Sequence, residues 1–99
     1  MPNPKRKGSD WEREIVTLAR AHGLEAERAW GSNGKALGES EQVDVLVHGM
    51  RVQAKRRKHV ADFLQIPKSC DAVFFRQDRG ESLVLLRLSD LLDKLEQGW

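Results

Sequence analysis

Three polar side chains interrupt a stretch of the chain whose pattern is otherwise that of two β-strands. Residues 42–58 read QVDVLVHGMRVQAKRRK, and Asp44, Gln53 and Lys55 stand among its apolar positions. A carboxylate and an amide supply oxygen ligands of the kind that Mg²⁺ prefers. An ammonium group can orient a water molecule and stabilise a developing negative charge. Together these residue types suit the metal-assisted hydrolysis of a phosphodiester.

The position of the turn decides whether these side chains can meet. His48-Gly49 predicts a two-residue turn between the two apolar runs. The register that follows is Val47 with Met50, Leu46 with Arg51, Val45 with Val52, and Asp44 with Gln53. Opposed residues have Cβ atoms about 4.5–5.5 Å apart, and strand alternation puts Lys55 on the same face as Gln53. The spacing alone leaves open a second interpretation, in which these residues form the solvated face of an edge hairpin.

A second acid would complete a metal site, and the first predicted helix offers one. Side chains recur at helical intervals at Trp11, Ile15, Leu18 and His22. This pattern predicts a helix over 9–22, ending before Gly23. Glu12 lies at the flank of its apolar face, where a carboxylate can face a sheet, whereas Arg13 points to solvent. Glu12 also follows Ser9 at capping-box spacing, so a helix-capping role is an open alternative.

The remaining pattern predicts alternating helices and strands. The expected elements are the first helix, a strand over 24–30, the two hairpin strands, a short helix over 60–66, strands over 71–76 and 82–88, and a last helix capped by Ser89. This α-β-β-β-α-β-β-α order argues for an α/β fold with a central mixed β-sheet flanked by helices. Residues 31–41, GSNGKALGESE, predict a mobile loop.

Size and composition suit a single domain over residues 1–99, with a flexible basic arm at 1–8. The chain has 99 residues, of which 39% are hydrophobic and 32% charged. No stretch approaches the ~20 apolar residues of a membrane span, and the start lacks the apolar run of a secretory signal. We therefore expect a cytoplasmic protein. The single Cys70 excludes an intramolecular disulfide and is expected to be a small buried side chain.

Basic residues are clustered although the net charge is only +2. One cluster is Lys5, Arg6 and Lys7, and the other is Arg51, Lys55, Arg56, Arg57 and Lys58, with no acid between them. Local basicity of this kind suggests a polyanionic partner. Ordinary solvated charge is the alternative.

Several of these residues together resemble a known family. The opening KRKGSDWEREIVTLARAHGLEAERAWGS, followed by VDVLV and VQAK, is similar to the archaeal-type Holliday junction resolvases of the PD-(D/E)xK nuclease superfamily. The likeness covers roughly the first two-thirds of the chain, and the last third is matched only in element order. The resemblance implies a restriction-endonuclease-like core and a nuclease activity.

The resemblance also implies roles for individual residues. Glu12 matches the helix acid, Asp44 the metal-binding aspartate, and Lys55 the motif lysine. The other matches are a loop serine, Ser40, and two arginines that contact or position DNA in relatives, Arg13 and Arg28. The second strand acid of the family is Gln53 here, so metal affinity should be lower. The same glutamine-x-lysine variant resembles the nuclease domain of Mrr-type restriction enzymes.

The expected function is that of a Mg²⁺-dependent structure-selective endodeoxyribonuclease that cuts four-way DNA junctions, with Mn²⁺ able to substitute. Paired incisions at related positions favour a homodimer with one site per subunit. We expect no membrane association and no small-molecule cofactor. The alternatives are another nuclease of the superfamily, restriction-like or repair, and a DNA-binding module without catalysis.

The candidate residues fall into three sets. The catalytic set is Glu12, Ser40, Asp44, Gln53 and Lys55. The metal ligands are Glu12, Asp44, Gln53 and the backbone carbonyl of Ala54. The DNA contacts are Lys5, Arg6, Lys7, Arg13, Arg28, Ser32, Lys35, Arg56, Arg57 and Lys58.

Overall fold

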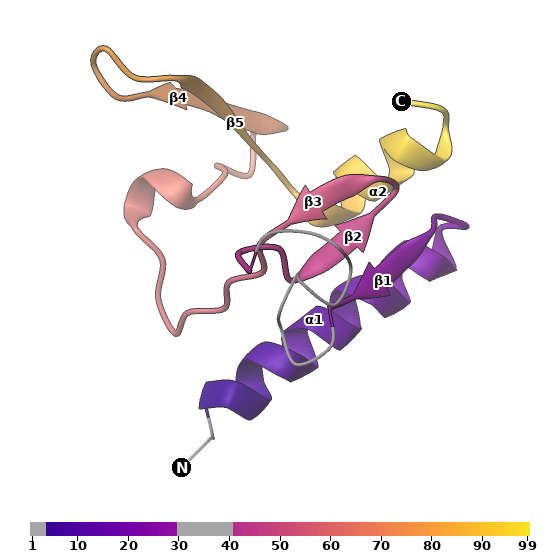
Figure 1. Ribbon diagram of the computed structural model, residues 1–99. Helices are drawn as coiled ribbons and strands as arrows, with labels where there is room; N and C mark the ends of the chain where they lie inside the picture. Colours follow the sequence, from indigo (N-terminus) through magenta and orange to yellow (C-terminus); the bar gives the residue numbers. More distant parts are fainter. Residues whose placement is uncertain (1–3, 30–40) are drawn as a thin grey trace. The chain divides into compact units, whose positions relative to one another are not determined.

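The computed structural model describes residues 4–29 and 41–99 (Figure 1). Most of the predicted loop lies outside the described residues, as do Ser32, Lys35 and Ser40. The chain divides into two compact units, Met1–Arg56 and Arg57–Trp99. The expected single domain therefore stays a prediction. Within the described ranges, no helix is long and apolar enough to cross a membrane.

The first unit begins with a long helix, α1, at Pro4–Ala21. Proline suits a first helical position because its φ is already helical and its missing N–H needs no partner there. The helix therefore starts well before Ser9 and includes residues 4–8 of the predicted basic arm, whose flexibility stays a prediction. The capping-box interpretation is also wrong, since Ser9 lies inside the helix. The predicted end is confirmed by Gly23, whose φ is +76°.

Three short antiparallel strands complete the first unit: β1 at Ala26–Arg28, β2 at Val45–Val47 and β3 at Met50–Val52, in the order β1-β2-β3. The hairpin register is the predicted one over Val45–Val52, Leu46–Arg51 and Val47–Met50. His48 and Gly49 have φ angles of 50° and 80°, as a two-residue primed turn requires. The turn residues thus fixed the register of β2 on β3.

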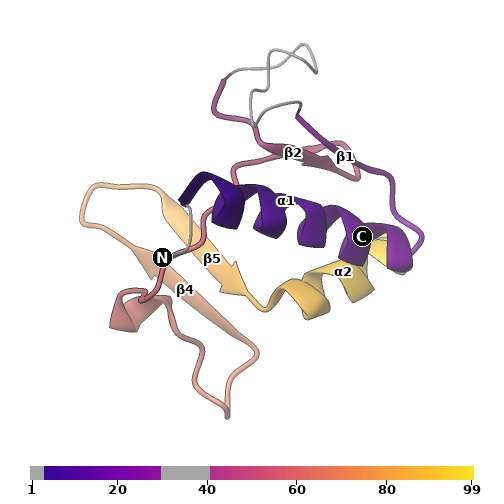
Figure 2. The same ribbon diagram turned by 90° about the horizontal axis from the view of Figure 1, so that it is seen from below.

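The core of the first unit lies between α1 and the sheet. Figure 2 shows α1 running along one face of β1 and β2. The buried apolar residues of this unit are Ile15, Val16, Ala19, Leu24, Ala29, Val43, Val45 and Val47. Apolar side chains recur about every 3.6 residues along the helix and every second residue along the strands, so one face of each element is apolar. The same packing turns the flank of α1 that carries Glu12 toward the sheet.

The second unit contains a 3-10 turn, η3, at Asp62–Leu64, a hairpin of β4 at Ala72–Arg76 and β5 at Ser82–Leu86, and a helix, α2, at Leu88–Glu96. The helix predicted over 60–66 is therefore reduced to a single turn. The chain before α2 is extended at Arg87, which is the N-cap and makes no side-chain capping bond. The predicted Ser89 cap is wrong because Ser89 is already helical. Cys70 is exposed, not buried.

The fold class is α/β, but the strands in the described part of the chain do not form the expected central mixed sheet. The described strands make two separate antiparallel sheets, β1-β2-β3 and β4-β5, and no parallel pair occurs among them. In the second unit the residues Gln77–Gly80 join β4 directly to β5, as predicted. A short turn makes its two strands antiparallel neighbours, whereas a parallel pair needs a long crossover connection.

Candidate functional site

Glu12 is the buried acid of the first unit. Its exposed fraction is 4%, the value of a core residue, and it is the one buried charged residue that the described ranges contain. It shares a helix face with Ile15, Val16 and Ala19, which follow it at helical spacing. A buried carboxylate is costly unless a counter-ion and hydrogen bonds compensate the lost hydration. Arg28 supplies both, since its Nε donates to Glu12 Oε1 at 3.3 Å.

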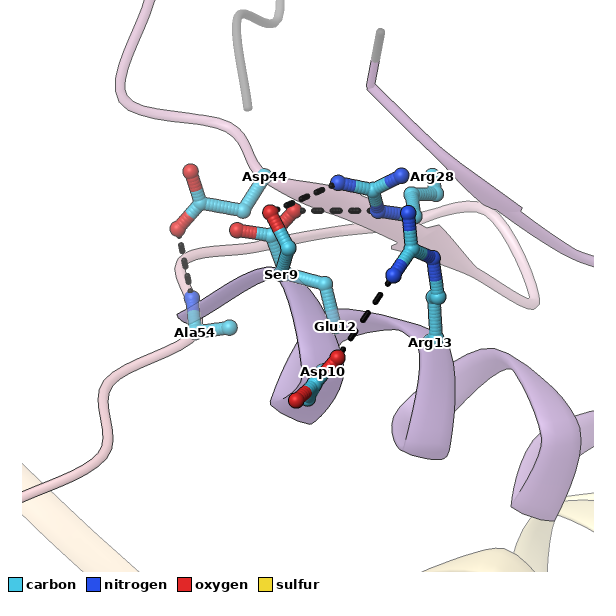
Figure 3. Close-up of polar contacts among 7 residues, drawn as sticks. All are labelled: Ser9, Asp10, Glu12, Arg13, Arg28, Asp44 and Ala54. Atoms are coloured by element: carbon cyan, nitrogen blue, oxygen red, sulfur yellow. Dashed lines mark hydrogen bonds and ion pairs between the residues drawn. The ribbon is translucent and has the colours of Figure 1, made fainter. Parts of the chain in front are cut away.

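Arg28 reaches from β1 to the helix in two places. Besides its bond to Glu12, its Nη2 donates to the Oγ of Ser9 at 3.2 Å. Figure 3 shows the guanidinium lying against both helix residues. The Arg28 side chain is 20% exposed, so most of it is withdrawn from solvent. The guanidinium therefore connects one turn of α1 to the strand that precedes β2.

Asp44 lies just before β2 and is tied to both neighbouring segments. Its backbone carbonyl accepts from Ala29 N at 2.8 Å, and its backbone amide donates to Val52 O at 2.9 Å. Its carboxylate Oδ2 accepts from the backbone amide of Ala54 at 2.8 Å. The described register ends at the Val45–Val52 pair, so the predicted Asp44–Gln53 pairing lies one step beyond it. The carboxylate meets the backbone between Gln53 and Lys55.

Gln53 and Lys55 flank Ala54 and are both exposed. Among the described residues, no hydrogen bond or ion pair joins either side chain to Asp44 or Glu12. The structure brings the segment 53–55 to the Asp44 carboxylate through the Ala54 amide. It leaves the amide and ammonium groups of Gln53 and Lys55 accessible to a ligand.

Four separate segments of the first unit thus converge. Glu12 contacts Arg28, the next residue Ala29 bonds to the backbone of Asp44, and the Asp44 carboxylate bonds to Ala54. The candidate donors in this region are carboxylate, amide and backbone carbonyl oxygens. Such a hard, all-oxygen set fits Mg²⁺ or Mn²⁺ and does not suit a metal that prefers sulfur.

Of the predicted DNA contacts, Arg13, Arg56, Arg57 and Lys58 are exposed, whereas Arg28 is largely withdrawn from solvent. The Arg13 side chain is 63% exposed and forms a surface ion pair with Asp10 at 3.5 Å, which confirms that it points to solvent. Lys5, Arg6 and Lys7 belong to the first turns of α1.

Two contributors to the site were missed from the sequence. Ser9 was interpreted as a cap, although its spacing from Glu12 also places both residues on one helix face. The backbone amide of Ala54 gave no signal, because every residue except proline has one. Arg28 was predicted to contact DNA, and its hydrogen bond to Glu12 was not predicted.

The comparison with known proteins agrees with the class that these features suggest, an α/β nuclease with one acid on a helix and a second acid directly before a strand of the neighbouring sheet. A model of the archaeal Holliday junction resolvase (Hjc) family matches residues 3–97. The chain belongs to this family. The match confirms the resemblance and extends it over nearly the whole chain, including the last third. No curated protein and no solved structure matches the chain.

Proposed function

We propose that this chain is a divalent-metal-dependent endonuclease that resolves four-way DNA junctions by paired incisions. Membership of the resolvase family implies a nuclease that acts in DNA recombination. One observation supports placing the active site around Glu12 and Asp44 in the first unit. The helix acid and the strand aspartate are linked through Arg28, Ala29 and the backbone of Asp44.

The residues proposed to hold the metal are Glu12, Asp44, Gln53 and the carbonyl of Ala54. When bound, Mg²⁺ supplies Lewis-acid polarisation of the scissile phosphate. Asp44 is already oriented by Ala54, so one of its oxygens is fixed before any ligand arrives. Gln53 offers a neutral oxygen where the family has an acid, which lowers the negative charge of the donor set and hence its affinity for a cation.

Lys55 is proposed as the group that acts on the attacking water. Its ammonium is exposed and stands two residues beyond Gln53, on the segment that Asp44 holds. In this position it can orient the water and stabilise the negative charge that builds up on the phosphate oxygens. Its exposure leaves room for a DNA backbone to approach.

Basic residues are proposed to bind the DNA phosphates. In the described part of the chain these are Lys5, Arg6, Lys7, Arg13, Arg56, Arg57 and Lys58; Ser32 and Lys35 belong to the same proposal. Contacts with phosphates set affinity and its salt dependence without reading base sequence. Selectivity would then come from the geometry of the junction.

A homodimer is proposed because a four-way junction must be cut twice at related positions. Two-fold symmetry supplies two equivalent sites, one per subunit. The second unit exposes large apolar side chains, including Phe63 at 60% and Phe74 at 83%, which are candidates for such a contact. Sedimentation of the purified protein, alone and with junction DNA, tests this part of the proposal.

The activity is tested by titrating Mg²⁺ and Mn²⁺ into cleavage reactions on a synthetic four-way junction. Linear duplex, nicked and flap DNA of the same sequence are run beside it, together with the Asp44→Asn variant. We expect paired, metal-dependent incisions in the junction alone and none from the variant. Equal cutting of linear duplex would favour a restriction-like nuclease. Absence of incision in every branched DNA would leave a non-catalytic DNA-binding module.

A further inference from the structure

We infer that Arg28 is a positioning residue for Glu12, not a DNA contact, and that Ser9 holds Arg28 in place. The inference rests on the proposed function, because it assigns how the helix acid of that site is oriented. It starts from the two donations of one guanidinium, Nε to Glu12 at 3.3 Å and Nη2 to Ser9 at 3.2 Å.

The geometry of the guanidinium suits this role. Its N–H groups form a rigid planar fork, so two acceptors that both bond to it are fixed relative to each other. Ser9 and Glu12 are three residues apart on α1 and therefore lie on the same helix face. With both contacts made, the guanidinium has little freedom to rotate, and the Glu12 carboxylate is held at Oε1.

The position of Arg28 in the sheet extends this control to the second acid. In the register of β1 on β2, Arg28 lies opposite Val45, and the following residue bonds to the carbonyl of Asp44. The residue that holds Glu12 is thus one step along the ladder from Asp44. Arg28 thereby fixes the position of the Glu12 carboxylate relative to Asp44.

Arg28 is less exposed than an arginine that is suited to bind phosphate. Its side chain is 20% exposed, against 63% for Arg13 on the outer face of α1. The Nε of Arg28 has a single N–H, so a phosphate that bonded it there would have to displace Glu12. Displacing the counter-ion of a buried carboxylate is costly, so the pair is expected to persist when DNA binds.

The test is the Arg28→Lys variant, which keeps the positive charge and removes the fork. A lysine ammonium is a point charge and cannot reproduce both contacts, whereas it can still attract a phosphate. We expect its junction affinity without metal to stay within about twofold of the wild type. We expect its single-turnover cleavage rate at saturating protein to fall by about 10- to 100-fold, as for residues that orient metal ligands.

Ser9→Ala is the second variant, and it leaves the charge of the protein unchanged. It removes the acceptor of Nη2 but leaves the Nε contact to Glu12, so the cleavage rate should fall by about fivefold, less than for Arg28→Lys. Arg13→Ala is the comparison for an exposed arginine, and we expect it to weaken junction binding and to reduce its salt dependence.

Titration calorimetry with Mn²⁺ alone distinguishes failure of this inference from failure of the proposed function. Arg28→Lys should bind Mn²⁺ about tenfold more weakly than the wild type because the Glu12 carboxylate is no longer held. A variant that loses junction affinity but keeps the cleavage rate and the Mn²⁺ affinity would overturn the inference. If the wild type cuts no DNA, the proposed function fails. Unchanged Mn²⁺ binding by Arg28→Lys and Ser9→Ala would then also reject the positioning role, and weakened binding would support it.

Discussion

The carboxylate of Asp44 accepts a hydrogen bond from the backbone amide of Ala54, with 2.8 Å between Oδ2 and N (Figure 3). This contact joins the residue before β2 to the segment that follows β3. It holds an acid against the backbone between Gln53 and Lys55, the two exposed polar residues of that segment. The donor is a main-chain group, so the contact depends only on the acceptor at position 44.

The first prediction separates the charge of Asp44 from its role as an acceptor. Asp44→Asn keeps an oxygen that can accept from Ala54 but loses the negative charge that a metal needs. We expect cleavage to be abolished, with junction affinity and thermal unfolding nearly those of the wild type. Gel-based cleavage and binding assays on one preparation measure both.

Asp44→Ala is the matched control for this prediction. It removes the acceptor as well and leaves the half-buried Ala54 amide without its described partner. The free energy of unfolding should then fall by about 1–3 kcal/mol. Equal loss of junction binding in Asp44→Asn would show that residue 44 holds the DNA or the fold instead of acting in catalysis.

The second prediction contrasts two neighbouring basic residues, Lys55 and Arg56. Both are exposed, so neither substitution should disturb the fold. Lys55→Ala should abolish cutting and leave junction binding nearly intact. Arg56→Ala should weaken binding to all DNA and reduce the slope of log affinity against log salt by about 1. Fluorescence anisotropy over a salt series, beside cleavage assays, measures the difference, and identical behaviour of the two variants would reject distinct roles.

The third prediction concerns the neutral amide at position 53. Gln53→Glu adds a carboxylate where the family has an acid, so the Mg²⁺ concentration for half-maximal cleavage should fall by about two- to tenfold. Gln77→Glu adds the same charge in the turn between β4 and β5 and should leave that concentration unchanged. An inactive Gln53→Glu protein that no longer folds, as judged by circular dichroism, would show that the amide is structural.

The fourth prediction compares two glycines at which an added Cβ meets no atom within 4 Å, Gly49 and Gly8. Gly49 has φ of +80°, which L side chains rarely adopt, so Gly49→Ala should lower the free energy of unfolding by about 1 kcal/mol. Gly8 lies inside α1, where alanine is the better helix former, so Gly8→Ala should raise it by about 0.5–1 kcal/mol. Urea denaturation measures both, and effects of equal sign would contradict the assignment.

Some features were determined by the sequence itself because short-range geometry decides them. His48-Gly49 permits only a tight turn, and this fixed the register of β2 on β3. The helical period turned Glu12 toward the sheet and Arg13 to solvent. The helix start and the Ser89 cap were misplaced because several polar residues near a helix end offer comparable starting points.

The tertiary structure alone decided which polar groups meet. Arg28 is separated from Glu12 by 16 positions and from Ser9 by 19, so no local pattern links them. Their contact depends on how β1 packs against α1. The same holds for the Asp44 carboxylate and the Ala54 amide, which are ten positions apart. They meet because the β2–β3 hairpin brings the residue before β2 next to the segment after β3. The sequence therefore determined which residues could act, through local turn and helix geometry, whereas long-range packing decided which of their atoms are in contact.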